Sequence, residues 1–170
     1  MTNNKKIEKL EKQLNKISEE LESLKKEEQE WPQFGDDCFY CNLSGDIYGV
    51  AWAGRDSDQR SFELGNLYRT KEEVENKVRA TRLEAAIARR RKELNGEWVL
   101  DWSGAQNNYH IYYSRYWEPE GETLRVACTV NYVFTTAFGF YKSRDDAKTI
   151  IEEFEEELRW YFTEYLPSIN

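Results

Sequence analysis

Residues 5–30 repeat apolar side chains at alternating intervals of three and four positions. Two apolar positions in seven form a narrower stripe than a helix shows when it packs on a globular core. The pattern is typical of a coiled-coil seam, so the sequence predicts an oligomerisation helix in residues 1–30. A single solvated helix lying on its own protein body is the alternative. The seam positions are Ile7, Leu10, Leu14, Ile17, Leu21 and Leu24.

After Trp31-Pro32 the apolar residues form short runs separated by turn chemistry. Proline pushes the preceding residue out of the helical region, so the first helix is expected to end here. The runs predict strands over residues 37–42 and 47–53, followed by a polar turn and a third strand over 60–64.

A long helix is predicted over residues 71–94. Thr70 with Glu73 has the spacing of a capping box, which marks the helix start. Asn95-Gly96 is a typical helix stop, because glycine readily adopts the left-handed conformation that ends a helix.

A second unit follows the same plan. Ser143 with Asp146 resembles a second helix start, which predicts a final helix over 144–165 that ends before Pro167. The strands predicted before it cover residues 97–102, 109–117, 123–135 and 138–141.

Residues 67–74 match residues 140–147 position by position in chemical type, at an offset of 73. The match favours a duplicated unit, with convergent capping chemistry as the alternative. The predicted fold class is α+β, with an N-terminal coiled-coil helix followed by two antiparallel β-meander-plus-helix units. The predicted segments are 1–30, 31–95 and 96–170.

Composition narrows the functional classes. The 170 residues carry a formal net charge of -8, and 15% of them are aromatic. That many aromatic residues argue against wholesale disorder, and the acidic balance argues mildly against extensive contact with nucleic acid. No apolar run is long enough to predict a membrane-spanning helix. The Lys-, Glu- and Asn-rich start is unlike a secretory signal, so a cytoplasmic location with free thiols is expected.

Candidate catalytic and metal chemistry is sparse. Cys38 and Cys41 form a single CxxC, and Cys128 and His110 are the remaining zinc-type ligands. In a strand the CxxC cysteines point to opposite faces, and a redox pair normally caps a helix. His110 adjoins no recognisable nucleophile motif, and phosphate-loop and dinucleotide fingerprints are missing. We therefore expect no enzyme activity, no metal and no cofactor.

The two long helices are oppositely charged. Residues 77–92 contain seven basic residues and one acid, whereas residues 145–164 contain eight acids and two basic residues. The basic helix is a candidate contact for nucleic acid or an acidic partner, through Arg89, Arg90 and Arg91. The alternatives are a solvated surface, or the two helices packed side by side with complementary charge.

Aromatic residues are concentrated in the second unit. Tyrosine and tryptophan are enriched at protein interfaces, so Tyr112, Tyr116 and Trp117 are candidate partner-binding residues. Stacking on nucleic-acid bases is the competing use, although only Arg115 and Arg125 supply nearby positive charge.

The chain resembles a family in its segment order. A Lys/Glu-rich heptad start leads to Trp31-Pro32, then to Gly-Asn-Leu-Tyr-Arg-Thr-Lys-Glu-Glu at 65–73 and Tyr-His-Ile-Tyr-Tyr at 109–113. In this order the chain resembles small accessory proteins encoded by phages and prophages of Gram-positive bacteria. The resemblance implies a location in the host bacterial cell and carries over no catalytic residue.

The resemblance gives the leading hypothesis. The chain is expected to bind and inhibit a host protein by covering its surface, for example a CRISPR nuclease or another defence protein. It is expected to be a homo-oligomer through residues 5–30. The alternatives are a nucleic-acid-binding module that uses helix 77–92, and a small-ligand binder, for example of a nucleotide.

Overall fold

The computed structural model describes residues 10–19, 31–100, 103, 106–114, 123–129 and 136–169. These residues form helices and two two-stranded antiparallel sheets, which confirms the α+β class. They group into two compact units, which are described separately. The N-terminal unit comprises Met1–Tyr40 and Gly49–Arg69, and the C-terminal unit comprises Cys41–Tyr48 and Thr70–Asn170.

The strands β1 (Asp37–Cys41) and β2 (Ile47–Ala51) form a hairpin. Residues 37–40 and 49–51 of these strands belong to the N-terminal unit, whereas Cys41–Tyr48 belongs to the C-terminal unit. On its other side, β1 makes one isolated bridge, in which Phe39 and Tyr68 exchange backbone hydrogen bonds of 2.9 Å. Apart from its first residue, β2 is exposed along its length. The buried core of the N-terminal unit is small and consists of Cys38, Trp52 and Leu67.

The predicted third strand over 60–64 is wrong, because this segment belongs to α2 (Asp56–Glu63). The Asp58 carboxylate accepts the backbone N–H of Arg55 and of Ala53, each at 3.2 Å. These bonds satisfy donors at the helix start, where acidic side chains also complement the helix dipole. The polar turn predicted before this strand is therefore the start of a helix.

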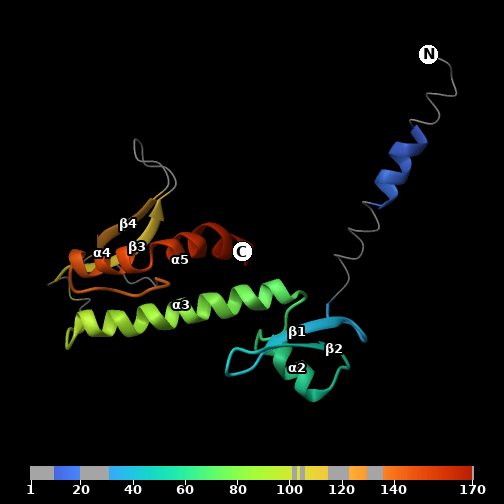
Figure 1. Ribbon diagram of the computed structural model, residues 1–170, viewed down its shortest axis with the longest axis horizontal. Helices are drawn as coiled ribbons and strands as arrows, with labels where there is room; N and C mark the ends of the chain where they lie inside the picture. Colours follow the sequence, from blue (N-terminus) through green and yellow to red (C-terminus); the bar gives the residue numbers. More distant parts are fainter. Residues whose placement is uncertain are drawn as a thin grey trace, which may run out of the picture. The chain divides into compact units, whose positions relative to one another are not determined.

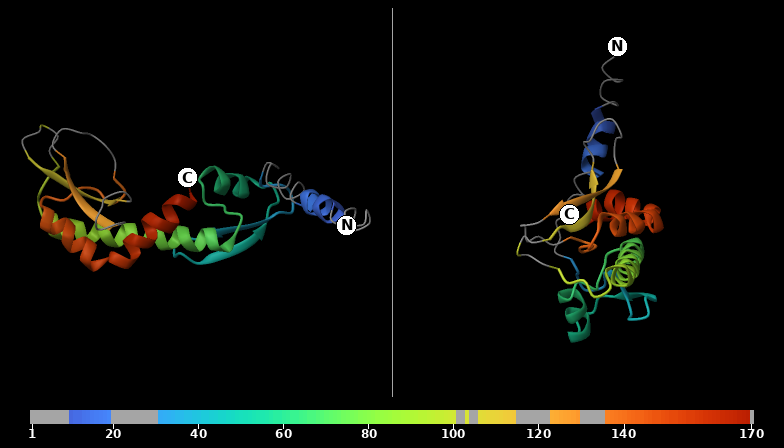
Figure 2. Two further views of the ribbon diagram at one scale, coloured as in Figure 1. Left: turned by 90° about the horizontal axis from the view of Figure 1, so that it is seen from above. Right: turned by 90° about the vertical axis from the view of Figure 1, so that its left-hand side faces the viewer.

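The C-terminal unit packs one long helix against a broken one. Figure 1 shows α3 (Lys71–Asn95) alongside α4 (Arg144–Glu153) and α5 (Glu155–Trp160), with the hairpin of β3 and β4 beside α4. Figure 2 shows the same grouping from above. The remaining elements of the unit are β3 (Asn108–Ser114), β4 (Thr123–Thr129), η1 (Tyr161–Tyr165) and α6 (Leu166–Ser168).

Both predicted helix starts are confirmed. Thr70 Oγ1 accepts the Glu73 N–H at 3.2 Å, and Ser143 Oγ accepts the Asp146 N–H at 3.1 Å. The Glu73 carboxylate returns the bond to the Thr70 N–H at 3.2 Å, which completes a capping box. The predicted helix 71–94 is observed as α3, which ends before Gly96 at a positive φ of 58°.

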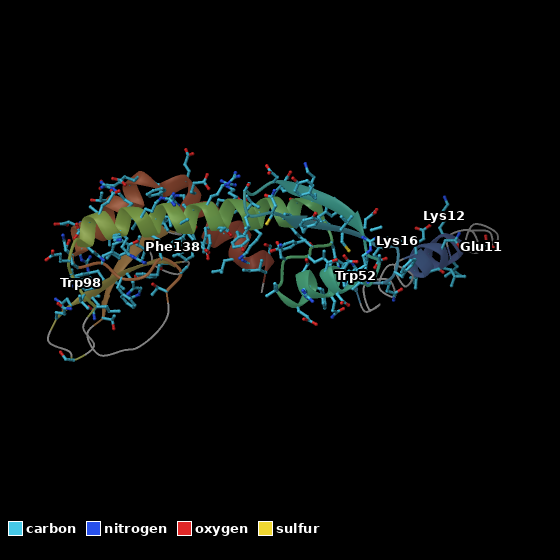
Figure 3. The ribbon with its side chains drawn as sticks, turned by 90° about the horizontal axis from the view of Figure 1, so that it is seen from below. Glu11, Lys12, Lys16, Trp52, Trp98 and Phe138 are labelled. Carbon is cyan, nitrogen blue, oxygen red and sulfur yellow. The ribbon has the colours of Figure 1, made fainter. Side chains whose placement is uncertain are left out.

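The core of the C-terminal unit lies between α3 and the segment from α4 to η1. Residues of α3 spaced three and four apart face inward, as expected of an amphipathic helix. Phe138, from the loop before α4, is buried beside α3 (Figure 3). The largest fully buried side chains here are Ile87, Tyr141, Ile150 and Leu158.

Two further strand predictions are wrong for the described residues. Residues 97–100 form a turn and loop, where the Gln106 side chain binds the Val99 carbonyl and the Trp98 indole N–H. Residues 138–141 make only an isolated bridge, because Arg91 and Asn95 of α3 donate to the carbonyls of Phe138 and Phe140. Side chains thus occupy backbone groups that a strand would use.

The other strand ends and the final helix also differ from the prediction. Residues 115–117 and 130–135, predicted to extend β3 and β4, lie outside the described residues. The helix predicted over 144–165 is interrupted at Phe154, whose φ of -127° is not helical.

The two isolated bridges lie at the predicted repeat offset. Tyr68 bonds to β1 and Tyr141 bonds to β3, each two residues before the cap of the following helix. The duplication itself stays a prediction, since α3 belongs to the C-terminal unit, whereas α2 and most of β1, which precede it, belong to the N-terminal unit. The predicted segments 31–95 and 96–170 therefore do not coincide with the two compact units.

We expect Ile150→Ala to lower the free energy of unfolding by about 2–5 kcal/mol, because it leaves a cavity in a fully buried site. Urea unfolding followed by the helical circular dichroism signal measures the change. Val99→Ala is the control, since Val99 is 77% exposed and its truncation should cost less than about 0.5 kcal/mol. Equal losses in both variants would contradict the placement of the core.

Candidate functional site

The three candidate arginines of α3 have different surroundings. Arg89 is exposed and has no ion pair or hydrogen bond to any residue that the structure describes. Arg90 binds Glu153 of α4 through three hydrogen bonds of 2.7 to 3.1 Å, and Glu93 at 3.0 Å. Arg91 donates to the Phe138 carbonyl. Two of the three are therefore occupied within the unit.

Arg91 is held under the loop that carries Gly139. A Cβ added at Gly139 would overlap the Arg91 guanidinium, and Gly139 also has a positive φ of 69°. This conformation suits glycine and is strained for other residues. The contact explains why Arg91 is half-buried rather than displayed.

A second ion pair, between Arg79 and Glu157, joins α3 to α5. Arg79 binds Glu157 through two hydrogen bonds of 2.9 and 3.0 Å, and its guanidinium carbon lies 3.8 Å from the centre of the Trp160 ring. Together with the Arg90–Glu153 pair, it shows the basic and acidic helices packed side by side with complementary charge. That alternative from the sequence is thus confirmed for these pairs.

Tyr112 is the one candidate aromatic residue that can be placed. It is exposed on β3, directly opposite Arg125 on β4 in the antiparallel register. Tyr116 and Trp117 lie outside the described residues.

Tyr112 and Arg125 line a groove of about 500 Å³, which we call the basic groove. Its opposite wall is α4, which contributes Arg144 and Lys148. Both are exposed, and neither has a carboxylate partner among the residues described. Glu152 is the one acid among the groove's lining residues. The remaining lining residues are Thr123, Leu124, Val126 and Ile151.

Sequence reasoning missed the basic groove because its cations come from separate elements. Arg144 and Lys148 stand in the predominantly acidic last helix, where a net charge count hides them. Their i, i+4 spacing places them on one helix face, which was the available signal. The third cation joins them only through the packing of β4 against α4.

His110 and Cys38 have structural surroundings. The His110 ring lies 5.9 and 6.2 Å from the rings of Phe140 and Tyr112, measured between centroids, and burial lowers its pKa. Cys38 is fully buried, and burial raises the pKa of its thiol. Among the described residues, no group of three or more metal-binding side chains occurs.

The N-terminal unit exposes large apolar side chains, which we call the apolar surface: Phe34, Val50, Phe62 and Leu64. Phe34 and Leu64 are 86% and 83% exposed. Phe62 is anchored by edge contacts with the rings of Trp31 and Trp52, at centroid distances of 6.0 and 6.2 Å. Figure 3 shows Trp52 beside α2.

Residues 10–19 form the described part of the predicted coiled-coil helix. Leu10, Leu14 and Ile17 are each more than half exposed in the single chain. The charged side chains of Glu11, Lys12 and Lys16 project from the same helix (Figure 3). The other predicted seam residues, Ile7, Leu21 and Leu24, lie outside the described residues.

Comparison with known proteins gives no relative. No family model, curated protein or solved structure matches the sequence. In the described part of the chain, no helix has the length and apolar character needed to cross a membrane.

The Arg90–Glu153 contact makes a testable electrostatic prediction. Hydrogen bonding from Arg90 lowers the pKa of Glu153. We expect Arg90→Gln to raise this pKa toward its ordinary value, measured by carbon NMR titration of the carboxyl group. Because the folded pKa is depressed, the stabilisation exists above the unfolded pKa and is lost as the pH falls through the folded value.

Arg89→Gln is the matched control, because Arg89 neighbours Arg90 in sequence but makes no described contact with Glu153. The pKa of Glu153 should not change in this variant. An equal rise in both variants would show that the general charge of α3, rather than the Arg90 contact, lowers the pKa.

Proposed function

We propose that the chain is a phage-encoded accessory protein that binds a host protein and inhibits it by covering its surface, without catalysis. A defence protein such as a CRISPR nuclease is the proposed class of target. The observation that carries the binding proposal is the apolar surface of the N-terminal unit. The phage origin rests on the resemblance of the segments 65–73 and 109–113.

The energetics of the apolar surface favour a protein partner. Full burial of a Phe or Leu side chain contributes about 1.5–3 kcal/mol, and both Phe34 and Leu64 are left almost fully in water. Contiguous exposed apolar patches mark protein interaction sites more often than isolated apolar residues do. The core of this unit is small and consists of Cys38, Trp52 and Leu67, so a partner would add substantially to the unit's buried area.

The exposed strand β2 adds a second binding element to the proposal. Its burial pattern shows four exposed residues out of five. A strand at a sheet edge presents unpaired backbone groups, which other chains recognise by strand addition. A host strand or loop that docks here would gain backbone hydrogen bonds in addition to apolar contacts.

We also propose that residues 5–30 form a homo-oligomeric coiled coil. The exposure of Leu10, Leu14 and Ile17 supports this, because a seam without a partner helix leaves its apolar residues in water. An oligomer would present several copies of the apolar surface, which raises the apparent affinity for a multivalent target.

The host-binding proposal predicts site-selective crosslinking. A photoreactive residue placed at Leu64 should link the full-length protein to one discrete host protein in a bacterial lysate, and Phe34→Ser should reduce the yield several-fold. The reason is that both side chains are large, exposed apolar groups of the N-terminal unit. Mass spectrometry of the crosslinked band measures the outcome.

The same photoreactive residue at Val99 is the control for non-specific crosslinking. Like Leu64, Val99 is apolar and exposed (77%), but it lies in the C-terminal unit. A product that forms equally from position 99, or that Phe34→Ser leaves unchanged, would argue against the apolar surface as the binding site.

The coiled-coil proposal predicts a change in molecular mass. Leu14→Ser with Ile17→Ser should lower the oligomer order, measured by light scattering during size-exclusion chromatography. Lys12→Ser with Glu19→Ser changes outward heptad positions on the same helix and should retain the wild-type mass. A seam variant that keeps the mass of the wild-type oligomer would refute the predicted seam.

A further inference from the structure

We propose that the basic groove of the C-terminal unit binds the phosphate group of a nucleotide, with the base stacked on Tyr112. The nucleotide is either free or part of a single strand. This site is separate from the apolar surface, and it does not depend on the identity of any host protein. The argument rests on four side chains: Tyr112, Arg125, Arg144 and Lys148.

The hairpin places an aromatic ring and a guanidinium side by side. Tyr112 and Arg125 are directly opposite each other in the register of β3 and β4. Side chains opposite each other in an antiparallel pair have their Cβ atoms about 4.5–5.5 Å apart. A ligand on this surface can therefore touch the ring with its base and the guanidinium with its phosphate.

The opposite wall supplies charge that is not neutralised by described residues. Arg144 and Lys148 are four positions apart on α4, so they lie on one face of the helix. Arg79, Arg90 and Arg159 of this unit differ, because each is bound to a glutamate at 2.7 to 3.0 Å. The basic groove thus keeps a local positive potential in an acidic protein.

The arrangement suits phosphate better than a single carboxylate. A phosphate group has several oxygens that can accept from more than one cation, and Arg forms paired hydrogen bonds with it. Base stacking on an aromatic ring tolerates every base, so little sequence preference is expected. The volume of about 500 Å³ lies within the range of small-ligand sites.

The overall charge limits the ligand to a short one. A formal net charge of -8 repels a long polyanion outside the groove, and Glu152 adds a negative charge to its lining. A mononucleotide or a few nucleotides of single strand would contact the three cations without crossing the acidic remainder of the surface.

The test uses the full-length protein at low salt and a fluorescently labelled probe. A mononucleotide and a six-nucleotide single strand are compared by fluorescence anisotropy. Arg144→Gln with Lys148→Gln should weaken binding of the probe about tenfold or more, because charge-assisted hydrogen bonds are lost. If three cations contact phosphates, the slope of log affinity against log salt should be about -2 and should fall to about -0.7 in this variant.

Arg89→Gln with Lys92→Gln is the matched control, since it removes two exposed cations of α3 that do not line the basic groove. It should leave the affinity within about twofold. Tyr112→Leu should weaken binding of the nucleotide probe. The dissociation constant of inorganic phosphate, obtained from its competition with the bound probe, should stay at its wild-type value. Circular dichroism confirms that each variant is folded.

Either probe binding through the groove cations supports the proposal, and their relative affinities identify a free nucleotide or a strand. Three outcomes would overturn it: absence of binding at low salt, equal losses in the groove and control variants, or equal binding of a poly-glutamate peptide. The last result would show a general anionic surface contact instead of a phosphate site.

Discussion

The packing of α3 against the segment from α4 to η1 is the interaction on which the C-terminal unit depends. Buried Leu83 and Ile87 of α3 meet Ile150 and Leu158 in one apolar core. Ion pairs at the margins, Arg90 with Glu153 and Arg79 with Glu157, are exposed and contribute modestly to stability. These ion pairs do, however, fix which helix faces meet, since opposite charges line the two sides of the interface between α3 and the segment from α4 to η1. The hairpin of β3 and β4 then packs beside α4, and the basic groove follows from that placement.

Local chemistry in the sequence predicted the helix starts well. Thr70 and Ser143 act as caps through bonds to residues three positions later, so their signal is complete within a few residues. The prediction of a third strand in the first unit failed because Asp58 resembles a turn residue in the sequence. In the structure its carboxylate accepts two backbone N–H groups at a helix start. The strand predicted over residues 138–141 is wrong for a non-local reason. Side chains of α3, more than forty residues away in sequence, donate hydrogen bonds to the backbone carbonyls of this segment.

The candidate sites also divide into features with a local sequence signal and features that depend on tertiary packing. The charge complementarity of the long helices could be read from composition, and the exposed seam residues could be read from their spacing. The basic groove could not, because Arg125 and Lys148 come together only when β4 and α4 pack. The apolar surface was also missed, since Phe34 and Leu64 look like ordinary core residues until the small size of the N-terminal core is known. Exposure depends on the whole fold rather than on residue type.

The contact between Arg91 and Gly139 constrains how this sequence can vary. Any side chain at position 139 would displace the guanidinium, and a shorter residue at 91 would remove the guanidinium donor of the Phe138 carbonyl, which also accepts from the Tyr141 hydroxyl at 3.4 Å. The two positions are forty-eight apart in the chain, yet they share one small volume. During divergence they should change together: a relative with a larger residue at 139 would carry a smaller one at 91. Such paired substitution would leave a covariation signal between two elements that look unrelated in sequence.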